Sequence, residues 1–86
     1  MRILVIEDEI KLREQLVSRL EKQGYAVDAA SDGEEGLYLA REHPFDAAVI
    51  DLGLPKLSGI DLIRQLRAEG SVLPVLILTA RSRWQE

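Results

Sequence analysis

Two short stretches decide the fold: AAVID at residues 47–51 and ILVIEDE at residues 3–9. In each stretch, a continuous apolar run rich in Val and Ile ends in one or more acidic residues. Continuous apolar runs of this kind are typical of parallel strands that are buried on both faces. Acids at the carboxyl ends of such strands lie at the edge where open α/β sheets bind ligands. The two stretches therefore predict buried strands whose acids, Glu7, Asp8 and Asp51, meet at the carboxyl edge of the sheet. We call the place where they meet the mouth.

The rest of the chain alternates between strand and helix patterns around these two stretches. Strands are predicted at residues 2–6, 25–30, 46–51 and 74–79. Each of the three intervening segments begins with a residue that can cap a helix, namely Asp8 or Glu9, Asp32, and Ser58. The resulting order, βαβαβαβ, requires a parallel sheet with right-handed crossovers. We therefore predict an α/β fold with helices on both faces of one sheet.

Composition limits the classes of function that the chain can have. Its 86 residues are enough for one small domain, and its lack of cysteine excludes disulfides and thiolate metal sites. No apolar stretch approaches the roughly 20 residues of a membrane helix, and no signal-peptide pattern follows Met1, so a cytoplasmic location is expected. The net charge of −4 argues against nucleic-acid binding by these residues themselves.

The acids at the two strand ends have two interpretations. Taken singly, Glu7 and Asp8 are ordinary helix-capping residues and Asp51 is an ordinary turn residue. These separate explanations do not account for the fact that both strands end in acid. The second interpretation is a shared cation site. At about 5 Å and an effective dielectric near 20, each like-charged pair costs on the order of 3 kcal/mol, which a hard cation would remove. Mg²⁺ suits such a set of carboxylates, and a carboxylate at this edge can also attack a phosphoryl group.

Two further residues lie at the same predicted edge of the sheet. Thr79 ends the fourth strand; it is either an ordinary β-branched strand residue or a hydroxyl that can bond a phosphoryl oxygen. Gly53 follows Asp51 by two residues and lets its backbone approach a ligand closely.

With these residues in place, the chain resembles a bacterial response-regulator receiver domain. The resemblance is carried by motifs along the whole chain: residues 3–9, Asp32-Gly33, residues 46–55 (DAAVIDLGLP), Gly59 and residues 74–81 (PVLILTAR). Within that family, residues 51–55 and 78–81, with Trp84-Gln85, look most like the OmpR/PhoB type and especially PhoP-like regulators.

The resemblance implies a role for each site residue. Asp51 would be the phosphoacceptor for a sensor histidine kinase. Asp8 would bind Mg²⁺ directly, Glu7 through water, and the Gly53 carbonyl would complete the protein ligands together with Asp51. Thr79 would be the switch hydroxyl that moves towards the phosphate. The resemblance thus implies a signalling domain that is not an enzyme and at most assists its own phosphorylation and dephosphorylation.

The chain also departs from the family pattern. A receiver has a flavodoxin-like (CheY-like) sheet in the order 2-1-3-4-5, with a helix after each strand. Residues 1–86 are expected to be its N-terminal part, without helix four, strand five, helix five or the DNA-binding output domain of a transcription regulator. A competing hypothesis is therefore a non-signalling fragment that self-associates through the exposed edge of its fourth strand.

Overall fold

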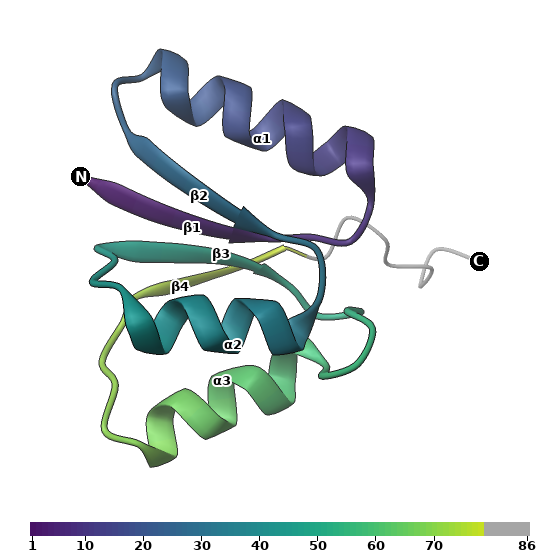
Figure 1. The fold of residues 1–86 in the computed structure, drawn as a ribbon, viewed down its shortest axis with the longest axis vertical. Coiled ribbons are helices and arrows are strands. Elements are labelled where there is room, and N and C mark those ends of the chain that lie inside the picture. The colour runs from purple at the N-terminus through teal and green to yellow at the C-terminus, as the bar shows by residue number, and fades with distance from the viewer. Residues whose placement is uncertain (79–86) are drawn as a thin grey trace.

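The computed structural model describes residues 1–78 as alternating strands and helices (Figure 1). The four strands are β1 (Arg2–Ile6), β2 (Ala26–Ala30), β3 (Ala47–Asp51) and β4 (Val75–Leu78). The three helices are α1 (Ile10–Lys22), α2 (Gly33–Glu42) and α3 (Gly59–Ala68). The predicted order is confirmed within these residues, and Thr79, at the end of the predicted fourth strand, lies outside them.

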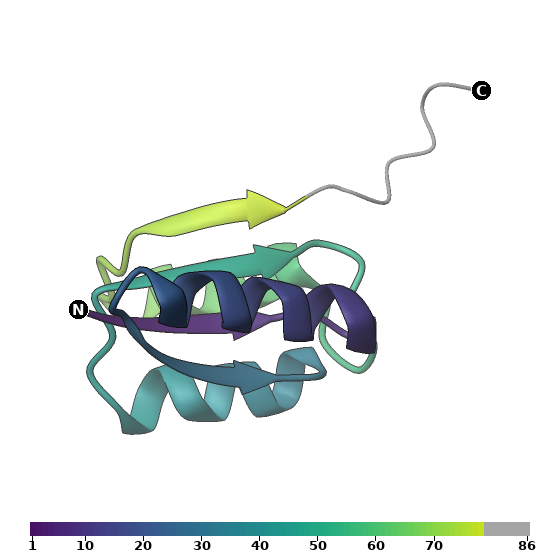
Figure 2. The same ribbon diagram turned by 90° about the horizontal axis from the view of Figure 1, so that it is seen from above.

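The strands form one parallel sheet in the order β2-β1-β3-β4. Figure 1 shows α1 on one side of the sheet and α2 and α3 on the other, which makes three layers. Seen along the sheet, β2 and β4 lie at its two edges and β1 and β3 between them (Figure 2). The order reverses between β1 and β3, and ligands of open α/β sheets bind at such a switch point. Within the described residues, this is the three-layer, flavodoxin-like arrangement that the sequence predicted.

Polar side chains begin each helix at the predicted position. The Glu9 side chain accepts a hydrogen bond from the Leu12 amide at 3.2 Å, so Glu9 rather than Asp8 is the N-cap of α1. Asp32 caps α2 by accepting from the Glu35 amide at 2.8 Å. Ser58 caps α3 by accepting from the amide of Asp61 at 3.1 Å. These bonds satisfy amides that would otherwise lack a partner in the first helical turn.

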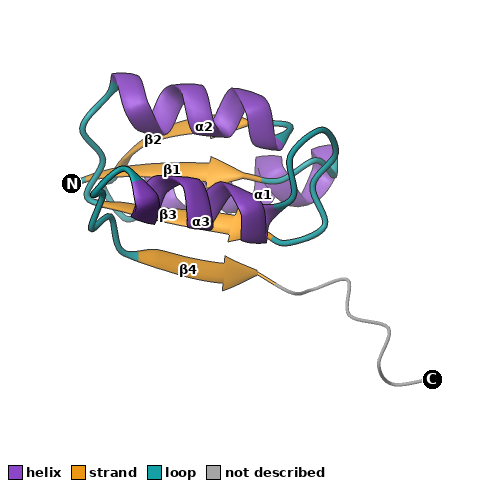
Figure 3. Cartoon of the chain, turned by 90° about the horizontal axis from the view of Figure 1, so that it is seen from below, coloured by secondary structure: helices purple, strands orange, loops and turns teal. Residues whose placement is uncertain are grey.

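The main core lies between the sheet and the helix pair α2 and α3. Leu4, Ile6 and Ile50 on the strands and Leu62 on α3 are fully buried in it. Helix α1 contributes no buried residue, although it contacts β1 and β2 on the opposite side. Figure 3 shows β4 lying beyond α3, at the margin of the helical layer. None of the helices in the described residues is long and apolar enough to cross a membrane.

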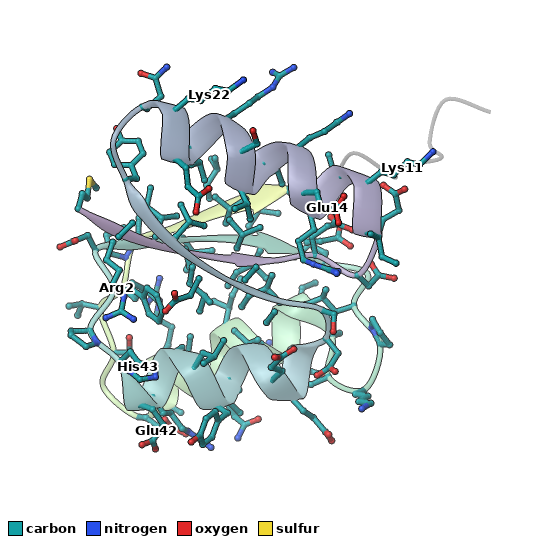
Figure 4. All side chains as sticks on the ribbon, turned by 45° about the horizontal axis from the view of Figure 1, so that its top comes forward. Arg2, Lys11, Glu14, Lys22, Glu42 and His43 are labelled. Atoms are coloured by element: carbon teal, nitrogen blue, oxygen red, sulfur yellow. The ribbon has the colours of Figure 1, made fainter. Side chains whose placement is uncertain are left out.

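The amino ends of the strands are held together around Arg2. Its guanidinium pairs with Asp28 on β2 at 2.7 Å and lies 5.2 Å from the centre of the Phe45 ring. Its amide donates to the Asp46 carboxylate at 2.7 Å. Figure 4 shows Arg2 and His43 at this end of the sheet. Lys11 and Glu14, near the start of α1, lie at the opposite end. These contacts fix the starts of the strands, at the edge of the sheet opposite their carboxyl ends.

Candidate functional site

Three acidic side chains converge where β1 and β3 end. Glu7 directly follows β1, and Asp51 is the last residue of β3, which pairs with β1 in parallel. Carboxylate oxygens of Glu7, Asp8 and Asp51 all lie within 4.8 Å of one another. Glu7 is 1% exposed and Asp51 is 2% exposed, whereas Asp8 is half-buried. The predicted meeting of these acids at one mouth is therefore observed.

The turn between β1 and α1 holds Glu7 and Asp8 in place. One carboxylate oxygen of Glu7, Oε2, accepts a hydrogen bond from the Glu9 amide at 2.9 Å. The Glu7 amide donates to the carbonyl of Ala30 on β2 at 3.1 Å. From α1, the Arg13 guanidinium donates to the Glu7 carbonyl at 2.9 Å. The turn is thus fixed from its own backbone, from the sheet and from the helix.

The loop between β3 and α3, residues 52–58, forms the second wall of the mouth. We refer to these residues as the β3–α3 loop. Its main chain is closed by hydrogen bonds from the Leu57 amide to the Pro55 carbonyl at 2.7 Å and from the Gly59 amide to the Leu52 carbonyl at 3.0 Å. Lys56 has a φ of 69°, the left-handed conformation that non-glycine residues rarely adopt. Gly53 is exposed, so its backbone is open to a ligand.

A charged pair links this loop to the turn before α2. Lys56 Nζ lies 3.6 Å from Asp32 Oδ2. The hydrogen bond from the Glu35 amide, with the charge of Lys56 in support, holds the pKa of Asp32 below its ordinary value. Asp32 is therefore ionised at neutral pH and acts as a helix cap and a partner of the loop rather than as a proton donor.

The donor set at the mouth suits a hard divalent cation. Three carboxylates at this separation repel one another, and a bound cation offsets that repulsion. Oxygen ligands, mostly carboxylates, are those that Mg²⁺ prefers, and it leaves room for water and phosphate oxygens. Glu7, Asp8 and Asp51 can therefore hold Mg²⁺. Of the other predicted site residues, Gly53 lies in the adjoining loop and Thr79 lies outside the described residues.

Some residues that shape the site were not singled out as functional from the sequence. Arg13 looks like one more charged residue of an amphipathic helix, and only the fold brings it to the Glu7 carbonyl. Gly33 and Gly59 were noted only as parts of motifs, although both touch the main chain of the β3–α3 loop. The signal in the sequence was their placement as the first residue within a helix, where glycine is less favourable than alanine.

Comparison with known proteins gives close relatives over the whole chain. The two-component response regulator PhoP of Pseudomonas aeruginosa is 57% identical over 86 residues. The virulence transcriptional regulatory protein PhoP of Salmonella typhimurium is 49% identical over the same length. Both alignments cover 100% of this chain but 38% of the relative, so the chain spans well under half the length of these proteins.

Solved structures agree with the fold. The receiver domain of a Francisella response regulator superposes with a TM-score of 0.90 at 34% identity, covering 98% of this chain and 70% of that one. The response regulator TrrA of Thermotoga maritima, in complex with Mg²⁺ and BeF, gives 0.88 at 33% identity, with 98% and 73% covered. TrrA in complex with the histidine kinase ThkA gives 0.85 at 33% identity, with 99% and 73% covered.

The family model for the response regulator receiver domain matches residues 3–86, which is nearly the whole chain. That match agrees with the order of the strands and with the acids at the ends of β1 and β3. The chain belongs to the response regulator receiver domain family, and its relatives include PhoP regulators.

Proposed function

We propose that Asp51 is a phosphoacceptor that takes a phosphoryl group from a histidine kinase in the presence of Mg²⁺. The observation that carries this proposal is the cluster of three carboxylates within 4.8 Å, two of them buried, at the ends of adjacent parallel strands. The complexes of TrrA with Mg²⁺ and BeF and with a histidine kinase support it by likeness.

Each residue of the cluster has a part in this reaction. Asp8 and Asp51, with the Gly53 carbonyl, would bind Mg²⁺, and Glu7 would act through water. When bound, Mg²⁺ neutralises the carboxylates and the charge of the transferring phosphoryl group. One Asp51 oxygen forms a bond to phosphorus while the bond from phosphorus to the kinase imidazole nitrogen breaks. The imidazole leaves with the electron pair, and the product is an aspartyl phosphate. Thr79 stays a predicted switch hydroxyl.

Phosphorylation by a small donor tests the role of Asp51. Incubation with acetyl phosphate and Mg²⁺, followed by intact-mass measurement, is expected to show one phosphoryl group that is added slowly to residues 1–86 and readily to the full protein. Asp51→Asn is the matched control, because it keeps the size of the side chain and removes the nucleophilic oxygen. An adduct that persists in Asp51→Asn, or that forms equally well in EDTA, would contradict the assignment.

Magnesium binding is tested separately by calorimetric titration. The wild-type chain is expected to bind Mg²⁺, and Asp8→Asn to bind it more weakly. Each like-charged pair costs on the order of 3 kcal/mol, and Asp8 forms such pairs with Glu7 and Asp51, so Asp8→Asn is also expected to stabilise the metal-free fold by up to roughly a few kcal/mol. Equal Mg²⁺ binding by wild type and Asp8→Asn would contradict the assignment of Asp8 as a metal ligand.

The proposal extends to a longer protein to which these residues would belong. By likeness to the PhoP regulators, residues 1–86 are the N-terminal part of a receiver domain in a cytoplasmic transcription regulator. Its partners would then be a cognate sensor histidine kinase and, through a separate output domain, DNA. Phosphotransfer from candidate kinases to the full protein, and DNA binding before and after it, are the corresponding measurements.

A second candidate behaviour is self-association through β4. In the described residues β4 is an edge strand, and its side chains Leu76 and Ile77 are 67% and 49% exposed. An apolar edge strand is a template for pairing with another chain. Light scattering on wild type and Ile77→Lys tests this idea. A monomeric wild type at high concentration would rule it out, as would association that a folded Ile77→Lys leaves unchanged.

A further inference from the structure

The β3–α3 loop is enclosed by two glycines whose missing side chains leave space for its main chain. Gly33 opens α2 and Gly59 opens α3, and both are buried. Each contacts the loop or the end of β3 through backbone atoms, one at either end of the loop. The two contacts differ in the part of the loop that they hold.

Gly33 holds the far end of the loop. Its amide donates to the Pro55 carbonyl at 3.2 Å. A Cβ added to Gly33 would lie 1.8 Å from the Leu57 carbonyl oxygen and 2.6 Å from the Leu57 carbonyl carbon. Both atoms belong to the backbone, so no side-chain rotation relieves the contact. Any side chain at this position displaces the loop from α2 by about 1 Å or more.

Gly59 holds the near end, next to the cluster of acids. Its amide donates to the Leu52 carbonyl at 3.0 Å. A Cβ added to Gly59 would lie 2.4 Å from the Asp51 carbonyl oxygen and 2.8 Å from the Leu52 Cα. A side chain here presses directly on the main chain of Asp51. The position of the buried Asp51 carboxylate therefore depends on Gly59 having no Cβ.

We propose that Gly33 and Gly59 are positioning residues that fix the β3–α3 loop, and with it Asp51 and the Gly53 carbonyl, in the geometry that binds Mg²⁺. The inference rests on the proposed magnesium site. Mg²⁺ demands near-octahedral ligands at about 2.0–2.1 Å, so a ligand loop displaced by about 1 Å no longer reaches it. Misplacement of this size in a site costs up to about 100-fold in function.

Two other glycines provide matched controls within the same chain. Gly24 and Gly70 follow α1 and α3 with φ of 95° and 90°, and a Cβ at either would meet nothing within 4 Å. Alanine at these positions strains the backbone and lowers stability, but it displaces no other segment. The two pairs therefore separate loss of stability from loss of loop position.

Calorimetric Mg²⁺ titration of the four alanine variants, each checked by circular dichroism, tests the proposal. Gly33→Ala and Gly59→Ala are expected to bind Mg²⁺ at least about tenfold more weakly than wild type. Gly24→Ala and Gly70→Ala are expected to bind within about twofold of wild type, because they leave the loop in place. If wild type binds Mg²⁺ and all four variants match it, the positioning role is overturned. A wild type that does not bind Mg²⁺ instead overturns the proposed function.

Hydrogen exchange on the wild type covers the case in which Gly33→Ala or Gly59→Ala does not fold. At Mg²⁺ about 100 times its dissociation constant, amides that exchange only through openings incompatible with binding gain about 100-fold protection. The amides of Gly33 and Gly59, which donate to the loop, are expected to gain this factor. The amides of Gly24 and Gly70, which donate to Glu21 and Arg67 at helix ends, are expected to gain far less. Equal gains at all four amides would overturn the positioning role.

Discussion

The two faces of the sheet carry similar residues and are buried to different degrees. On the face under α2 and α3, the closed face, β1 and β3 contribute Leu4, Ile6 and Ile50, all fully buried. On the face under α1, the open face, burial is complete only near β1. A hollow of about 360 Å³ lies there, lined by residues that include Leu20, Val49 and Leu76. Burial is therefore set by the helix above the strand and not by the strand's own apolar character.

One row of side chains across the open face shows this gradient. Val5, Val49 and Leu76 are partners in neighbouring strands, so they point to the same side of the sheet. Val5 is 0% exposed, Val49 is half-buried and Leu76 is 67% exposed. Helix α1 contacts β1 and β2, so the row is covered by α1 at Val5 and becomes exposed towards β4. The energetic consequence is that identical substitutions differ in effect according to the face on which they fall.

The largest difference is expected between leucines deleted from the two faces. Leu62 on α3 is 0% exposed in the core of the closed face. Leu62→Ala is expected to lower the free energy of unfolding by about 2–5 kcal/mol, from lost burial and the cavity left behind. Leu76→Ala, on the open face, is expected to cost less than about 1 kcal/mol. Urea denaturation followed by circular dichroism measures both, and equal losses would mean that the open face is covered in solution.

A smaller difference is expected from two adjacent alanines of β3. Ala48 is 1% exposed and belongs to the core of the closed face. Ala48→Val is expected to destabilise by about 1–3 kcal/mol, because the added methyl groups overpack that core.

Ala47 is half-buried, and its pairing with Ile3 places its side chain on the open face beside the hollow, so Ala47→Val is the matched control. It is expected to be neutral or to stabilise by up to about 1 kcal/mol, because the added groups enter available space. Thermal unfolding of the two variants gives the sign of each stability change. A destabilised Ala47→Val would show that the hollow cannot accommodate the added methyl groups.

The smallest effect is expected when the pH is lowered and an ion pair on the surface of the closed-face helices is lost. The Arg41 guanidinium on α2 donates to Glu69, just after α3, and holds the pKa of that carboxyl below its ordinary value of 4.5. A carboxyl whose pKa is lower in the folded state adds stability that is fully present above its unfolded-state pKa. That stability is lost as the pH falls through the folded-state pKa. Melting temperatures from pH 7 to pH 3 should therefore fall less in Glu69→Gln than in wild type; identical losses would assign the acid sensitivity to other groups.

Local features of the sequence predicted most of the fold. Helix starts followed from capping residues such as Asp32 and Ser58, whose bonds are short-range and independent of the rest of the chain. The convergence of Glu7, Asp8 and Asp51 also followed, because parallel strands put their carboxyl ends at one edge. The functional roles of these residues, of Gly53 and of Thr79 remain predictions.

Features that depend on packing between distant segments could not be predicted. The apolar residues of α1 recur at helical spacing, like those of α3, yet no α1 residue is buried. The contact of Gly33 with Leu57 joins residues 24 positions apart and depends on how two turns meet. The bond from Arg13 to the Glu7 carbonyl likewise exists only once α1 has docked. Periodicity identifies which side of an element is apolar, but not what covers it.

The parallel arrangement of the strands has a practical consequence for labelling. Met1 already belongs to the sheet, since its carbonyl accepts from the Ala26 amide at 3.0 Å, and Arg2 is anchored on both neighbouring segments. This end of the sheet is opposite the mouth formed by Glu7, Asp8 and Asp51. An affinity tag attached at this end of the sheet therefore sits a full strand length from the acids. Such a probe can immobilise the protein on a sensor surface and leave the mouth facing the solution.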